Sequence, residues 1–270
     1  MSAQEEQRDL TESGQVSRTD VDTLQTEDER RRSADDGRVL RDLAELVHEG
    51  RAEEIYRRVT DAAMRLGRSQ YSSMQSIEPD GAGGQHLRLL AFRGFNPRAA
   101  RFWEIVTIDG KSACSICMKT GARVVVPDVE SSELMAGSED RETLLQTGIR
   151  AVQTTPIISR RGKLIGMIST QWDRPHEPTA SELHNFDVLA RHAACLLERE
   201  ADAERRKLYE RAASYKKAEA AFERAASAIN RRMQQGVAPT VKELQRQRDA
   251  WLVLQAARRA FEEARDHVSD

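Results

Sequence analysis

The stretch AVQTTPIISRRGKLIGMISTQW, residues 151–172, decides the fold. Two runs rich in Val, Ile and Thr flank the four residues RRGK, and this pattern predicts two antiparallel strands joined by a tight turn. Gly162 suits the turn, and Gly166 suits close packing against a neighbouring strand. We therefore expect this hairpin to anchor a β-sheet.

Upstream and downstream of the hairpin, strand and helix patterns alternate. Strand-like runs lie at residues 71–78, 86–94 and 123–129. Helical periodicity lies at residues 39–67, 96–106 and from about Thr179 to Gln234. This order predicts an α+β fold, in which one mainly antiparallel sheet is flanked by helices and the helices at its two ends lie side by side.

Composition divides the chain into three parts. Residues 1–36 hold 11 acidic and 5 basic residues and few large apolar ones, so we expect a disordered acidic tail. Residues 38–200 form the folded domain. Residues 201–270 hold 11 acidic and 15 basic residues, are rich in helix formers and are broken only at 234–240, which predicts an all-α helical hairpin.

The hairpin sequence carries coiled-coil-like heptads. Large side chains recur every seven residues at Leu208, Tyr215, Phe222 and Ile229, at Leu244 and Trp251, and at Leu254, Phe261 and Val268. Two interpretations remain open: an intramolecular hairpin that extends the domain, or a surface for a dimer or a partner. Thr240 and Glu243 match a capping box and predict the start of the second helix.

Several classes of protein are not expected. No run of about 18 apolar residues occurs, which argues against a membrane span, and the polar start MSAQEEQRDL argues against a secretory signal. Three cysteines fit a reducing cytoplasm. The charges of the central part balance, so we expect neither a membrane nor a nucleic-acid partner.

Three stretches together are similar to a known family. They are LRLLAFRGFNPRAARFWEIV (87–106), DGKSACSICMKTGARVVVPDVESSELMAG (109–137) and the run from Thr147 to Arg199 that contains GIRAVQTTPI, GKLIGMIST and PHEPTASELHNFDVLARHA. The central part resembles a GAF domain, the small-molecule-sensing and dimerising module of bacterial signalling proteins. The resemblance implies a GAF-like sheet flanked by helices, and a homodimer.

The resemblance also implies a ligand cavity between the sheet and the segments that cover one face. Polar residues within apolar strands are the candidates to line it, together with two residues of the covering segment. They are Gln75, Gln153, Thr155, Ser169 and Gln171, with Trp103 and Cys114. Because strand residues alternate between faces, we expect some of these to point away from the cavity. The cofactor or ligand stays unidentified.

Cys114 and Cys117 form a C-x-x-C pair near a predicted helix start, where a thiolate is stabilised. This makes them redox candidates, although both also fit as ordinary packed residues. A metal site is not expected, because structural zinc needs four ligands and no second pair is present. On the long helix, His184, His192 and Cys195 are predicted to lie at the surface or at a dimer interface.

The function that follows is a non-enzymatic sensor with no catalytic residue. A small molecule or a redox change would shift the terminal helices and so a dimer or a signalling protein bound to the C-terminal hairpin. Two alternatives remain. One is a free methionine sulfoxide reductase, since Cys114 matches a cysteine of that GAF branch, although the loop SSELMAGSED lacks the second. The other is a pure interaction scaffold.

Overall fold

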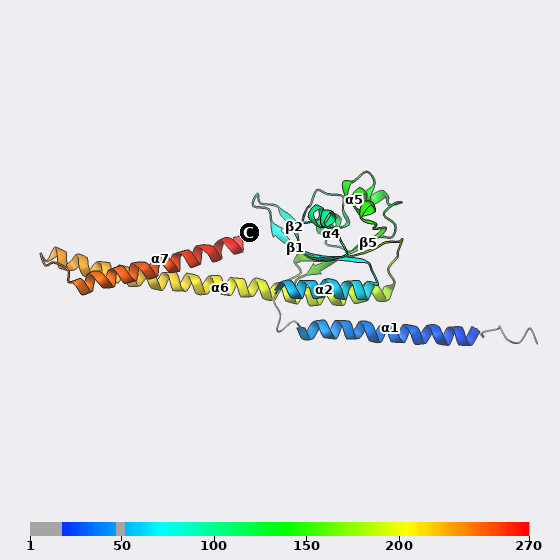
Figure 1. Cartoon of the computed structure of the whole chain (residues 1–270), viewed down its shortest axis with the longest axis horizontal. Coiled ribbons are helices and arrows are strands. Elements are labelled where there is room, and N and C mark those ends of the chain that lie inside the picture. Colours follow the sequence, from blue (N-terminus) through cyan, green and yellow to red (C-terminus); the bar gives the residue numbers. More distant parts are fainter. Residues whose placement is uncertain (1–17, 47–51, 270) are drawn as a thin grey trace, which may run out of the picture.

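The computed structural model describes residues 18–46 and 52–269. A six-stranded sheet lies between two layers of helices (Figure 1). One layer contains α2 (Ala52–Gly67) and the first part of α6 (Ala180–Gln234), and α1 (Arg18–Leu46) lies on the outer side of these two helices. The short helices α3 (Pro97–Phe102), α4 (Ala113–Thr120), η1 (Glu133–Met135) and α5 (Glu139–Thr147) belong to the other side. The predicted α+β class is confirmed.

The sheet is antiparallel throughout, with the strand order β3-β2-β1-β6-β5-β4. Its strands are β1 (Tyr71–Pro79), β2 (Gln85–Arg93), β3 (Ile105–Thr107), β4 (Val124–Val126), β5 (Ala151–Ile158) and β6 (Leu164–Trp172). The β5–β6 hairpin is the predicted one, and β6 is central because it also pairs with β1. Gly166 permits that pairing, since a Cβ there would lie 2.4 Å from the carbonyl oxygen of Gln75.

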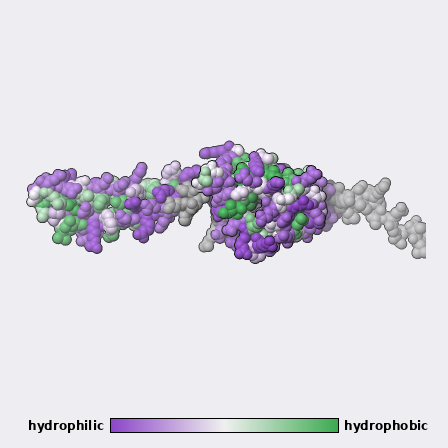
Figure 2. Space-filling model, turned by 90° about the horizontal axis from the view of Figure 1, so that it is seen from above, coloured by the Kyte–Doolittle hydropathy of each residue, from purple (hydrophilic) through white to green (hydrophobic). Residues whose placement is uncertain are grey.

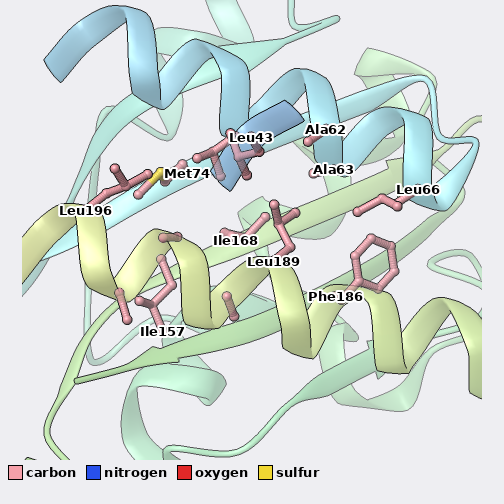
Figure 3. Packing of buried hydrophobic residues seen from close by; sticks show 14 of the residues in the cluster. Leu43, Ala62, Ala63, Leu66, Met74, Ile157, Ile168, Phe186, Leu189 and Leu196 are labelled. Carbon is pink, nitrogen blue, oxygen red and sulfur yellow. The ribbon is translucent and has the colours of Figure 1, made fainter. Parts of the chain in front are cut away.

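A hydrophobic layer joins the sheet to the terminal helices (Figure 3). Met74 and Ile168 project from the sheet, and Leu66 and Leu189 project from α2 and α6. All four are buried, and burying such a side chain contributes about 1.5–3 kcal/mol. The indole Nε1 of Trp172 also donates to the carbonyl oxygen of Gly67 at 2.9 Å. The last residue of β6 is thereby tied to the end of α2.

The segment 96–106 contains a helix followed by the start of a strand. The prediction of a helix over the whole segment was therefore wrong for its last residues. Asn96 caps α3 by accepting from the N–H of Ala99, as its position before Pro97 predicts. The helix ends at Phe102, and Ile105–Thr107 pair with β2 as β3. Three β-branched residues beside an open sheet edge favour the strand.

The N-terminal helix α1 extends further back than the sequence predicted. Residues 18–36 are helical where a disordered tail was expected, and residues 1–17 lie outside the described part of the chain. Val39 and Leu43 dock the end of α1 onto the domain. The carboxylate of Asp36 accepts from the side-chain amide of Asn185 at 2.8 Å. This docking supplies the tertiary contact that a polar helix needs.

Beyond the domain, α6 continues and turns back as α7 (Val241–Ser269), so the C-terminal hairpin projects from one end of the molecule (Figure 1). Thr240 and Glu243 form the predicted capping box. Tyr215 stacks on Phe261 at 5.9 Å between ring centroids. Leu244 and Trp251, by contrast, are 48% and 47% exposed. No described helix is long and apolar enough to cross a membrane.

Candidate functional site

A small cavity of about 30 Å³ lies on the face of the sheet that the terminal helices leave free. Strands β1, β5 and β6 form its floor, and α3, α4, η1 and α5 with their flanking residues cover it. The lining residues are Ser73, Gln75, Phe95, Trp103, Ser112, Ala113, Cys114, Met135, Asp140, Leu144, Val152 and Gln171. A space of this size holds about one water molecule.

The covering helix α4 is built by strong local signals. Ser112 accepts from the N–H of Ser115 as N-cap, and Gly121 adopts the left-handed conformation that ends the helix. This places Cys114 over the sheet, where its Sγ lies 3.5 Å from the Oγ of Ser169. Cys117, one turn later, is fully buried.

A hydrogen bond between an indole and a carboxylate holds two of the other segments that cover the cavity together. The Nε1 of Trp103 donates to Oδ1 of Asp140 at 3.1 Å, which links the end of α3 to the start of α5. Phe95 packs against Trp103 with ring centroids 5.0 Å apart. Burial raises the pKa of Asp140, although the hydrogen bond from Trp103 acts in the opposite direction.

Two glutamines on the cavity floor have unpartnered acceptors. The Oε1 atoms of Gln75 and Gln171 are buried and have no hydrogen-bond partner among the described residues. The amide nitrogen of Gln75 donates to the carbonyl oxygen of Trp103 at 3.4 Å. Buried acceptors without a partner are unfavourable, and their presence in one cavity is typical of a site that takes a donor.

The structure brings together four of the seven predicted ligand-binding residues: Gln75, Trp103, Cys114 and Gln171. Ser169 lies on the same side of the sheet but behind Cys114, where it bonds to Thr154 at 2.9 Å. The prediction was wrong for Gln153 and Thr155. Their side chains bond to each other and, through Gln153, to Thr170 on the face below the terminal helices. Alternation along β5 puts them there, because Val152 faces the cavity.

Burial disfavours the thiolate form of both redox candidates. It raises the pKa of Cys114 to about 11 and that of Cys117 to about 12. Cys195 is exposed on α6, and burial followed by the charge of Arg191 lowers the pKa of His192. Within residues 18–46 and 52–269, no group of three or more His, Cys, Asp and Glu side chains is arranged to hold a metal ion.

Sequence reasoning missed the residues that η1 and α5 contribute to the cavity. Asp140 follows the N-cap Ser138 of α5, where an acidic residue is ordinarily explained by the helix dipole. Met135 and Leu144 have the character of ordinary core residues. Ser73 could have been predicted from the sequence as a lining residue, because it lies two positions before Gln75 on the same face of β1.

A larger hollow of about 830 Å³ lies between α2, β2 and α3. Three of the arginines that line it are already paired, Arg57 with Glu53, Arg88 with Glu78 and Arg93 with Asp61. It is an open surface groove in which most of the arginines are paired. The small cavity with unpartnered acceptors is the stronger candidate for a ligand site.

A sequence family described as "GAF domain" matches residues 51–198, more than half of the chain. No curated protein matches.

Among solved structures, the chain is similar to a domain from Sinorhizobium meliloti 1021 described as part of a two-component sensor histidine kinase. That pair is 24% identical, with a TM-score of 0.48 and coverage of 59% of this chain and 99% of the other. It is also similar to the GAF domain of a phosphoenolpyruvate-protein phosphotransferase from Coxiella burnetii, with 17% identity, a TM-score of 0.49 and coverage of 61% and 93%. A third is free methionine-R-sulfoxide reductase from Neisseria meningitidis, with 15% identity, a TM-score of 0.48 and coverage of 61% and 89%.

Proposed function

The chain belongs to the GAF domain family, and from that premise we propose that it is a non-enzymatic sensor that binds a small polar molecule in the cavity beneath Trp103. A sensory or regulatory role is general to the family. The ligand, its effect and the absence of catalysis are the parts proposed here. The observation that carries the proposal is the pair of buried, unpartnered acceptors, Gln75 Oε1 and Gln171 Oε1, whose residues line the same cavity.

These acceptors define the chemistry of the ligand. Gln75, Gln171 and the carboxyl group of Asp140 all offer oxygen atoms to the cavity. Phe95 and Trp103 add aromatic surface beside them. A molecule that donates several hydrogen bonds and has a small apolar part fits this lining. Free amino acids, amino sugars and nucleosides are of this class.

The closed cavity requires a movement before such a ligand enters. A volume of about 30 Å³ is far below the several hundred Å³ that a metabolite occupies. We propose that the Trp103–Asp140 hydrogen bond opens and that the segments around α3 and α5 move outward. Binding then selects the open state by its differential affinity.

A path from the cavity to the terminal helices runs through β6. Gln171 lines the cavity, and the next residue, Trp172, lies on the opposite face and donates to Gly67 at the end of α2. The ring of Phe186 in α6 lies beside Gly67, since a Cβ at that glycine would meet it at 2.8 Å. A shift of β6 on ligand binding therefore displaces α2 and α6 together.

Thermal shift against a panel of free amino acids, amino sugars and nucleosides tests the proposal. We expect one member to raise the melting temperature of the full chain, and Gln171→Leu to abolish that response. Gln153→Leu is the matched control, because it removes a buried glutamine on the other face. It should lower stability and keep the response. Equal loss of response in both variants, or no response to any compound, contradicts the proposal.

The enzymatic alternative meets a physical obstacle. A reductase needs a nucleophilic thiolate and a resolving thiol, whereas burial raises the pKa of both Cys114 and Cys117. We propose that both cysteines are packing residues. Reduction of free methionine sulfoxide by the purified protein, lost in Cys114→Ser, would instead establish the enzyme.

The output is proposed to be a change in association. A homodimer through the terminal helices and a signalling partner on the C-terminal hairpin are both compatible with a cytoplasmic protein of this family. Sedimentation velocity with and without the ligand that emerges from the panel distinguishes a ligand-dependent dimer from a pure scaffold, whose association would not change.

A further inference from the structure

One face of α7 carries apolar side chains that nothing in the described chain covers. Val241 is 80% exposed, and Leu244, Trp251 and Leu252 are each about half exposed. We call these four residues the tip stripe, because they lie on the half of α7 that adjoins the hairpin turn. Figure 2 shows hydrophobic surface on this end of the projecting hairpin.

The tip stripe is separate from the contact between α6 and α7. At about 100° per residue, its four side chains fall within an arc of about 100°. The opposite side of α7 packs on α6 through Phe261, which stacks on Tyr215, and through the buried Ala264. The tip stripe is therefore as wide as an apolar face that ordinarily packs against another helix, but it faces away from α6.

The charge around the tip stripe points to its occupant. Residues 231–259 contain seven basic and two acidic residues, and of the basic ones Arg232 pairs with Glu243 and Arg258 with Glu262. Arg248 projects within the same arc as the tip stripe, and in the described part of the chain it makes no ion pair. An occupant must therefore cover apolar surface and also offer a negative charge near its centre.

Two other occupants fit less well. A second copy of α7, packed on this face about a two-fold axis near the middle of the tip stripe, would bring Arg248 near its own equivalent, and like charges at an interface are costly. A helix that lies on a bilayer surface carries its basic residues on the polar face, whereas Arg248 lies in the middle of the apolar face. A helix with carboxylates meets both requirements.

We propose that the tip stripe binds an amphipathic helix of a partner protein whose apolar residues are flanked by Asp or Glu, one of which pairs with Arg248. This surface makes the C-terminal hairpin a docking arm held away from the sensor cavity. The inference rests on the proposed function only in treating the hairpin as the output of the sensor.

The test uses the full chain and two synthetic helical peptides labelled with a fluorophore. Both carry the same leucine stripe, and the flanking positions are all Glu in one and all Lys in the other. Fluorescence anisotropy should show that the Glu peptide binds at least about tenfold more tightly. Trp251→Ala and Arg248→Glu should each weaken it by about tenfold or more. Tyr209→Ala, an exposed aromatic residue elsewhere on the hairpin, is the matched control and should change nothing.

Circular dichroism of each variant verifies that the helices are intact. Equal binding of both peptides, or unchanged binding in Arg248→Glu, overturns the proposal. So does a dimer of the full chain that Trp251→Ala dissociates, or recruitment to phosphatidylserine vesicles without binding of the Glu peptide. These measurements need no ligand in the cavity, so their failure leaves the sensor proposal standing, and the failure of the ligand panel leaves this one standing.

Discussion

The indole Nε1 of Trp103 donates to Oδ1 of Asp140 at 3.1 Å across the mouth of the cavity, and this bond joins two cover segments 37 residues apart. Asp140 is partly buried, and burial raises its pKa. This bond is the proposed closure of the candidate site, because Trp103 and Asp140 both line the cavity.

Asp140→Asn tests this closure through its pH dependence. The folded-state pKa of Asp140 is raised, so the stabilising contribution of the protonated carboxyl is complete below its ordinary value of about 3.9 and is lost as pH rises through the folded value. The amide keeps an acceptor for Trp103 but does not titrate. We expect the melting temperature of the variant, measured relative to that of the wild type, to rise as pH increases above about 4. A constant difference between the two proteins across this range would contradict the assignment.

The cysteines should differ sharply in reactivity. With a pKa of about 11, the thiolate fraction of Cys114 at pH 7 is about one in ten thousand. Cys117 is buried, whereas Cys195 is exposed. We therefore expect iodoacetamide at pH 7 to alkylate Cys195 first, with Cys114 and Cys117 protected until the protein is unfolded. Peptide mass spectrometry measures this, and rapid oxidation of Cys114 by hydrogen peroxide would revive the redox hypothesis.

Gly166 should tolerate no side chain. A Cβ there would lie 2.4 Å from the carbonyl oxygen of Gln75, which forces β1 and β6 apart beneath the cavity. We expect Gly166→Ala to lower the free energy of unfolding by about 3 kcal/mol. Gly162→Ala is the control, because it has open space and only a left-handed backbone to accommodate, at about 1 kcal/mol. Urea denaturation measures both, and similar losses in the two variants would refute the steric argument.

The fold was predictable where the sequence pattern had a single interpretation. The hairpin at residues 151–172 has β-branched runs and a turn of the right length, and it forms as expected. The strand Ile105–Thr107 has only three residues and directly follows a helical pattern, so its existence depends on the open edge of β2. Such a short strand is set by its neighbour and carries no periodicity of its own.

The candidate site was only partly predictable because β5 is buried on both faces. Residues 151–155 are all buried, so hydrophobic alternation does not say which side chains face the cavity. Gln153 and Thr155 therefore looked equivalent to Gln171. The same limit applies to the C-terminal helical hairpin. Heptad spacing places Leu244 and Trp251 on one face of α7, but it does not say whether that face packs on α6.

Leu43 should govern the docking of α1. Its side chain is 3% exposed in the hydrophobic cluster shared with α2 and α6, whereas residues 27–35 of α1 are exposed. We expect Leu43→Ala to weaken docking by about 2–4 kcal/mol, since a buried leucine is lost and the short contact surface offers little to compensate. Hydrogen exchange should then lose protection over residues 27–45 while strand β6 stays protected. Arg41→Ala, an exposed change on the same helix, should leave exchange unchanged. If Leu43→Ala left α1 protected, the helix would be held by contacts other than that of Leu43, such as the packing of Val39.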